Sequence, residues 1–113
     1  MGADSTLVFY GVRYQVTDGA ELEQLQAGNH PLMQAAKKAG LASYSGNFLT
    51  HDGDSLQLLY VGRELASLGL EGVENFELSD TEFAQIQLDV RRRLVRGGFS
   101  LKPALFAHFE ADV

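Results

Sequence analysis

Segments typical of β-strands lie at both ends of this chain. Apolar residues recur at alternate positions over residues 7–16 and again over residues 104–113. Two helical patterns and at least two further strand patterns lie between them. Consecutive elements usually pack beside one another, and parallel crossovers are right-handed. The order β-α-β-β-α-β therefore predicts an α+β fold: a ferredoxin-like, mostly antiparallel sheet with two helical segments on one face.

Two of the expected strands are apolar on both faces. The first strand carries Leu7 and Phe9 on one face and Val8 and Tyr10 on the other. Residues 56–61 are almost continuously apolar. A strand that is apolar on both faces is buried on both, which is typical of the centre of a sheet. Ferredoxin-like topology places its first and third strands in the centre, in agreement with this pattern.

Capping signals locate the helices. Asp18 suits the N-cap of a first helical segment over 19–39, and Pro31 suits the first turn of a second piece within it. We expect two short helices there, or one sharply kinked helix. Residues 79–82, Ser-Asp-Thr-Glu, form a capping box, and the helix that follows ends at Gly97.

Three connecting segments are less regular. Residues 51–54 contain Asp-Gly between two strand patterns, which predicts a tight hairpin turn. Residues 62–72 contain three glycines and fit either a short edge strand or a packed loop. Residues 73–78 are expected to form an additional strand.

Composition restricts the classes of function. The 113 residues correspond to a single domain, 1–113. Without cysteine the chain has no disulfide, thiolate metal ligand or cysteine nucleophile, and a reducing, cytoplasmic location is expected. The net charge of −6 repels phosphate backbones and anionic lipids. No apolar run could cross a membrane and no signal-peptide pattern is present, so neither nucleic acid nor membrane is expected as a partner.

The sheet face opposite the helices is expected to carry apolar side chains: Phe9, part of 56–61 and Phe106. An exposed apolar patch usually marks a surface that binds a partner or ligand. Three arrangements would cover it. Two copies could stack sheet to sheet as a homodimer, the face could line a cleft for a small apolar ligand, or residues 62–72 could fold over it.

The strongest candidates for acid–base chemistry lie on the last strand. His108 and Glu110 are two residues apart, so both side chains leave the same face. A histidine beside a carboxylate can act as a base with its orienting group. A pocket lined by Tyr10, Tyr14, Phe106 and His108 could belong to a cofactor-free enzyme or small-ligand binder. The alternative is that the tyrosines pack in the sheet and the polar pair faces water.

Other polar clusters have structural explanations. His51 lies beside Asp52, but the run lacks the alternating ligand spacing of a calcium loop, and no metal or cofactor is expected. His30 precedes a proline at a helix start, where capping or packing is natural. Arginines over 91–96 fall in the last turns of a helix, where they complement the helix dipole; phosphate binding is the alternative.

Three functions remain open. The leading expectation is a non-catalytic binding or interaction module that forms a homodimer through its sheet face. The architecture is similar to the dimeric α+β barrel superfamily, which includes small cofactor-free oxygenases and isomerases, so the resemblance implies an enzyme or small-ligand binder as the alternative. No motif transfers catalytic residues from that superfamily. A third possibility is an acidic inhibitor or immunity-type protein whose charge of −6 faces a basic protein partner.

Overall fold

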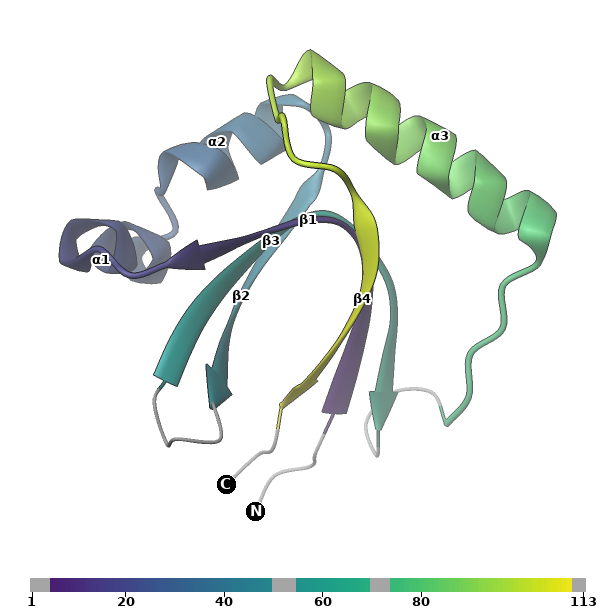
Figure 1. Cartoon of the computed structure of the whole chain (residues 1–113), viewed down its shortest axis with the longest axis horizontal. Coiled ribbons are helices and arrows are strands. Elements are labelled where there is room, and N and C mark those ends of the chain that lie inside the picture. Colours follow the sequence, from purple (N-terminus) through teal and green to yellow (C-terminus); the bar gives the residue numbers. More distant parts are fainter. Residues whose placement is uncertain (1–4, 50–54, 70–73, 111–113) are drawn as a thin grey trace.

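The described residues form an antiparallel sheet with helices on its outer side (Figure 1). The computed structural model describes residues 5–49, 55–69 and 74–110. The four strands lie in the order β2-β3-β1-β4, so β3 and β1 are central, as their two-faced apolar sequences predict. The elements are β1 (Ser5–Val16), α1 (Gly19–Ala27), α2 (Pro31–Lys38), β2 (Ala42–Leu49), β3 (Ser55–Gly69), α3 (Asp80–Arg96) and β4 (Ala104–Glu110).

The helices begin where the capping signals place them. The Asp18 side chain accepts a hydrogen bond from the Glu21 amide, and α1 ends at Gly28, whose φ of 75° is left-handed. Pro31 is the first residue of α2. Of the two alternatives expected over 19–39, the structure therefore has the two short helices. Both hydrogen bonds of the capping box are present at the start of α3.

Two facing glycines lie in the middle of the two long central strands. Gly11 of β1 is directly opposite Gly62 of β3. A Cβ on Gly11 would collide with the Val61 carbonyl oxygen, and a Cβ on Gly62 would collide with the Tyr10 carbonyl oxygen. Side chains are thus excluded from both positions, and the two backbones approach closely.

The sheet bends into an arch with two limbs (Figure 1). β2 pairs with the first half of β3, whereas β4 pairs with the first half of β1, so the glycine pair separates two pairing regions. We call residues 12–16, 42–49 and 55–61 the β2 limb. Residues 5–10, 63–69 and 104–110 are the β4 limb.

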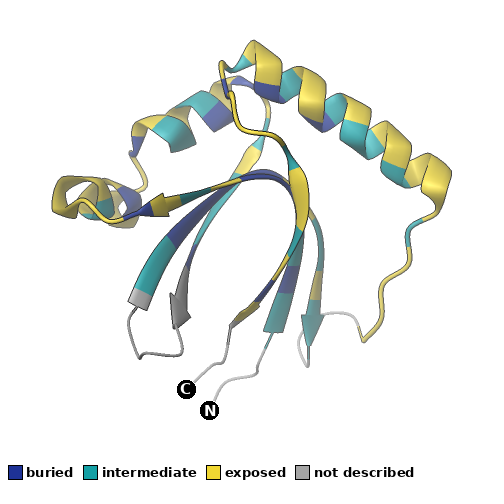
Figure 2. Cartoon of the chain, in the orientation of Figure 1, coloured by how far each residue is buried: buried dark blue, intermediate teal, exposed yellow. Residues whose placement is uncertain are grey.

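The main core lies between the sheet and the helices, on the outer side of the arch. It contains Tyr10 and Val12 of β1, Leu59 and Val61 of β3, and Val90 of α3, all buried. α2 packs on β2 and β3, and α3 packs on β1 and β3. Figure 2 shows buried residues concentrated at the top of the arch, beneath the helices.

A second core fills the inside of the arch. Leu7 and Phe9 of the β4 limb pack with Leu58 and Tyr60 of the β2 limb. The rings of Phe9 and Tyr60 are 5.7 Å apart. Phe9 is consequently only 1% exposed. The prediction of an exposed aromatic sheet face is therefore wrong for Phe9, because the opposite limb of the same sheet covers this side chain.

The two segments that follow residue 61, for which the sequence predicted a strand or loop and then a further strand, have different structures. Residues 62–69 continue β3 and pair with β1, which settles the choice between strand and loop over that range. The additional strand expected over 73–78 is absent from residues 74–78, whose backbone is irregular. Residues 74–77 are exposed and include Glu74 and Glu77, so they have no buried face that would favour strand pairing. The predicted hairpin turn at 51–54 lies outside the described residues.

Candidate docking edge at β4

The four residues proposed to line one pocket lie on opposite faces of the sheet. Tyr10 and Tyr14 belong to the outer core, whereas Phe106 and His108 contact the inner core. Arg91 Nε–H donates a hydrogen bond to Tyr10 Oη at 3.1 Å. Burial raises the pKa of the Tyr14 phenol. The structure therefore does not bring these four side chains together.

His108 has a partner that the sequence did not indicate. A hydrogen bond of 2.9 Å joins His108 Nδ1 to Tyr60 Oη, and both side chains are buried. The Phe106 ring lies 5.5 Å from that of Tyr60, and the Tyr44 ring lies 6.1 Å from that of His108. The bond connects the two limbs of the arch. The side chain of Glu110, the expected partner, lies outside the described residues.

Arg13 adds a charged contact to this interior. Its guanidinium lies 4.6 Å from the centre of the Phe106 ring, within cation–π distance. Arg13 comes from β1 and Phe106 from β4, so the contact also links the two limbs. No local sequence signal identifies such a pair.

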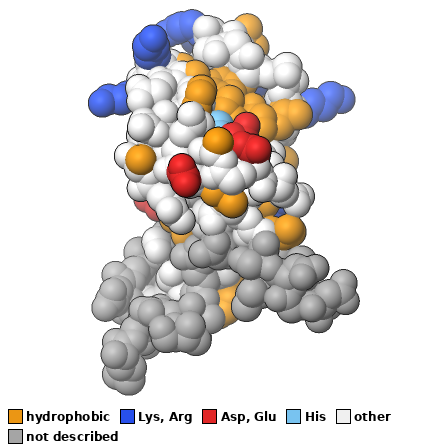
Figure 3. Space-filling view, turned by 90° about the vertical axis from the view of Figure 1, so that its left-hand side faces the viewer, with side chains coloured by type: hydrophobic (Ala, Val, Ile, Leu, Met, Phe, Trp, Pro, Cys, Tyr) orange, Lys and Arg blue, Asp and Glu red, His pale blue; other side chains and the backbone are white. Residues whose placement is uncertain are grey.

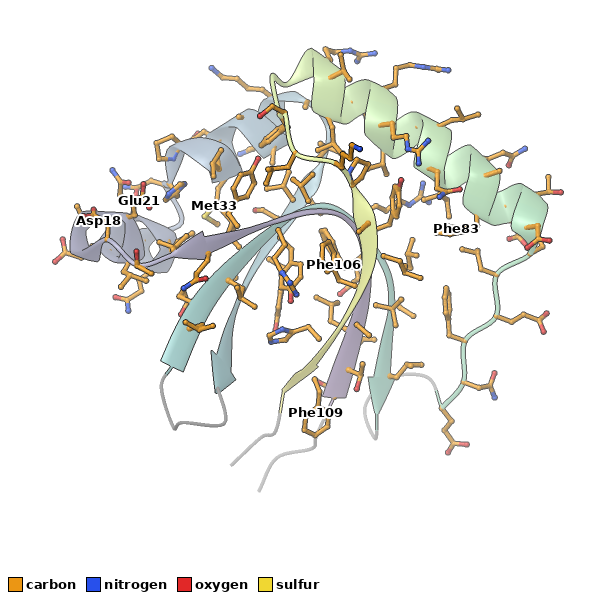
Figure 4. The ribbon with its side chains drawn as sticks, in the orientation of Figure 1. Asp18, Glu21, Met33, Phe83, Phe106 and Phe109 are labelled. Carbon is orange, nitrogen blue, oxygen red and sulfur yellow. The ribbon has the colours of Figure 1, made fainter. Side chains whose placement is uncertain are left out.

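His30 caps a helix, as expected. Its Nδ1 accepts a hydrogen bond of 3.1 Å from the Leu32 amide, and its Nε2 lies 4.0 Å from Glu21 Oε2. Asp18 and Glu21 lie at the start of α1 (Figure 4). Figure 3 faces this helical end, where hydrophobic and acidic side chains lie side by side.

Over residues 5–49, 55–69 and 74–110, no group of three histidine or acidic residues could hold a metal. His51 lies outside them.

Two arginines of the basic cluster have structural contacts. Arg93 Nε lies 3.0 Å from the Asp89 carboxylate, one turn earlier on α3, and Arg93 NH1 donates to the Ala39 carbonyl. Arg91 is held by Tyr10. These bonds connect α3 to the C-cap residue of α2 and to β1, so they explain this part of the cluster without a phosphate ligand.

Exposed apolar side chains lie on β4. Phe106 and His108 point into the arch, so Leu105, Ala107 and Phe109 point to the outer face. Leu105 is 54% exposed and Phe109 is 57% exposed. Phe109 lies near the far end of β4 in Figure 4, and much of the strand is exposed in Figure 2. On the neighbouring strand β1, by contrast, the side chains of Phe9, Tyr10 and Val12 are almost completely buried.

The backbone of β4 forms one edge of the sheet. Among the described strands, β4 pairs with β1 alone. Its register with β1 has no bulge, and residues 104–109 contain no Asp, Glu, Lys or Arg. Natural edge strands usually carry charges, prolines or bulges that prevent pairing with other chains. Here Pro103 precedes the strand and Glu110 is its last described residue, but residues 104–109 have none of these features.

The outer face next to β4 is also apolar. Val8 of β1 lies between Ala66 of β3 and Ala107 of β4, and Leu68 is near them on β3. All are at least partly exposed. At the opposite edge, α2 packs on β2. The β4 edge therefore combines backbone donors and acceptors with an incompletely covered apolar face. We call residues 104–110 the docking edge.

Comparison with known proteins gives no relative. No protein-family model, curated protein or solved structure matches the chain. Across the part of the chain that the structure describes, none of the helices has the length and apolar character needed to span a membrane.

Proposed function

We propose that this chain is a non-catalytic protein-binding module whose docking edge pairs with an extended strand of a protein partner. The carrying observation is the exposed, uncharged edge of β4, with Leu105 and Phe109 on its outer face. An extended strand added to a sheet edge gains backbone hydrogen bonds, while alternate side chains provide specificity. Adjacent apolar surface strengthens such docking.

The packed interior of the arch supports binding over catalysis. Phe9 and Tyr60 are buried by the opposite limb, and Tyr10 lies on the other face of the sheet from His108. A cofactor-free active site would need converging groups that a substrate can reach. The buried hydrogen bond between Tyr60 and His108 instead connects the two limbs of the arch.

We propose a ferredoxin-like topology for the fold. Counted from the β4 side, the strand order is β4-β1-β3-β2. Two split β-α-β units joined by the β2–β3 connection would give this order. A cytoplasmic location is part of the same proposal, supported by the absence of cysteine.

A peptide-binding experiment tests the function. The probe is a synthetic peptide of alternating Thr and Val, equal in length to β4, with a control peptide in which alternate residues are proline. We expect the Thr-Val peptide to shift the backbone amide NMR signals of β4 and its neighbours, and the proline peptide to leave them unchanged. Proline cannot donate to a strand ladder.

Two variants serve as matched tests of the site. Leu105→Lys places a charge on the docking edge and should weaken peptide binding. Leu88→Lys makes the same change at a residue of α3 that is 58% exposed, and should leave binding unchanged. The proposed function is refuted if no strand associates with β4, whether the peptide or another protein chain.

A further inference from the structure

The residues of the docking edge can pair with the same residues of a second copy of the chain. We infer that the strand it binds is β4 of a second copy of this chain, related by a two-fold axis through Ala107. This inference rests on the proposed function and specifies the partner. Homodimers are commonly built on two-fold axes, where one surface patch meets itself.

The proposed two-fold axis passes through the small residue Ala107, which is the middle residue of the described part of β4, Ala104–Glu110. An axis there pairs these seven residues of one copy with the same seven of the other. In an antiparallel pair, directly opposed residues point to the same face. Leu105 of each copy would then lie opposite Phe109 of the other. The small Ala107 side chains would meet at the axis, leaving space for the larger neighbours.

The charges along β4 are compatible with self-pairing. Within residues 104–110, the described part of the strand, Glu110 is the only acidic or basic residue, and it would lie opposite Ala104 of the second copy. Phe106 would lie opposite His108. No like charges oppose one another, although the chain as a whole carries a net charge of −6. Like charges opposed across strands would be destabilising, so a neutral edge is the part of this acidic molecule best suited to meet its copy.

The apolar surface would become continuous across the axis. Val8, Ala66 and Leu68 extend the apolar face inward from β4 in each copy. Self-pairing would cover the half-exposed Leu105 and Phe109 of both chains. A single strand of seven residues is only about 23 Å long, which is small beside the interface of a permanent dimer. We therefore expect a reversible dimer that depends on concentration.

A charge-exchange experiment tests the axis directly. Ala107→Lys and Ala107→Glu are each expected to weaken dimerisation by about tenfold or more, because like charges would meet at the axis. An equimolar mixture of the two variants should recover dimerisation as a heterodimer. Sedimentation equilibrium measures all three samples, and circular dichroism verifies that each variant is folded.

Further samples keep the test decisive. If either Ala107 variant fails to fold, Leu105→Lys and Phe109→Glu are mixed instead, since the axis brings these positions together. Leu88→Lys on α3 should dimerise like the unmodified chain. Added salt should strengthen dimerisation by screening the net charges of the two copies, whereas an acidic module held by a basic partner would lose affinity in salt.

Each outcome separates this inference from the proposed function. A chain that remains monomeric up to about 1 mM but binds the Thr-Val peptide refutes the second copy and keeps the docking edge. A monomer that also binds no strand refutes both. Dimerisation that is unaffected by the charged variants, or not recovered in their mixture, refutes the two-fold axis at Ala107.

Discussion

The glycine pair at the bend gives a quantitative test of the arch. Alanine at Gly11 would place a Cβ against the Val61 carbonyl oxygen and 2.8 Å from the Gly62 Cα. Both neighbours are backbone atoms of a central strand, so no side chain can move aside. The φ of 159° adds strain for any residue with a Cβ.

The expected loss of stability combines two contributions. Backbone strain costs about 1–2 kcal/mol. Separating the strands weakens two or more ladder hydrogen bonds, each worth about 1 kcal/mol. Gly11→Ala should therefore lower the free energy of unfolding by about 3 kcal/mol or more. With a urea m-value of about 1.5 kcal/mol/M, the unfolding midpoint falls by about 2 M.

Two other glycines provide matched controls. Gly28 has a φ of 75° but nothing within 4 Å of an added Cβ, so Gly28→Ala should cost only about 1 kcal/mol of backbone strain. Gly19 begins α1 and has open space around it, so Gly19→Ala should stabilise by about 0.4–1 kcal/mol. Urea unfolding followed by circular dichroism, at one fixed protein concentration, measures the series.

The ranking of the three variants decides the outcome. If Gly11→Ala is no less stable than Gly28→Ala, close approach of the backbones is not what requires glycine at the bend. The double variant Gly11→Ala with Gly62→Ala gives a further check. Because the first substitution already separates the strands, the second should cost less than it does alone.

Three further measurements probe other contacts. Tyr60→Phe removes the hydrogen bond to His108 and should lower the free energy of unfolding by about 1–2 kcal/mol in urea; an unchanged midpoint would contradict a stabilising link. Ser79→Ala removes the cap that binds the Glu82 amide and should cost about 1 kcal/mol, with faster amide exchange confined to the first turn of α3. Burial raises the pKa of Tyr14, so its contribution to stability is complete below the unfolded pKa of about 10 and is lost as pH rises through the folded value. Tyr14→Phe should therefore flatten the alkaline decline in stability, and an identical decline in both proteins would argue against this assignment.

Local chemistry in the sequence determined where the helices start. Asp18 and Ser79 each satisfy an amide three residues away, so a few neighbouring residues contain all the information needed. The central strands were also predictable, because side chains that are apolar on both faces require cover on both. His30 at the start of α2 followed from its position before a proline.

Tertiary pairing decided the arch and its interior. Gly11 and Gly62 face each other only once the register of β1 and β3 is set, and Tyr60 meets His108 across 48 residues of sequence. The sequence indicated that Phe9 needs cover, but not that the same sheet would bend back to provide it. Tertiary packing also decides the exposure of Leu105 and Phe109, which depends on how far α3 extends over the sheet. Short-range periodicity reports which face of a strand is apolar, and only long-range packing decides what covers that face.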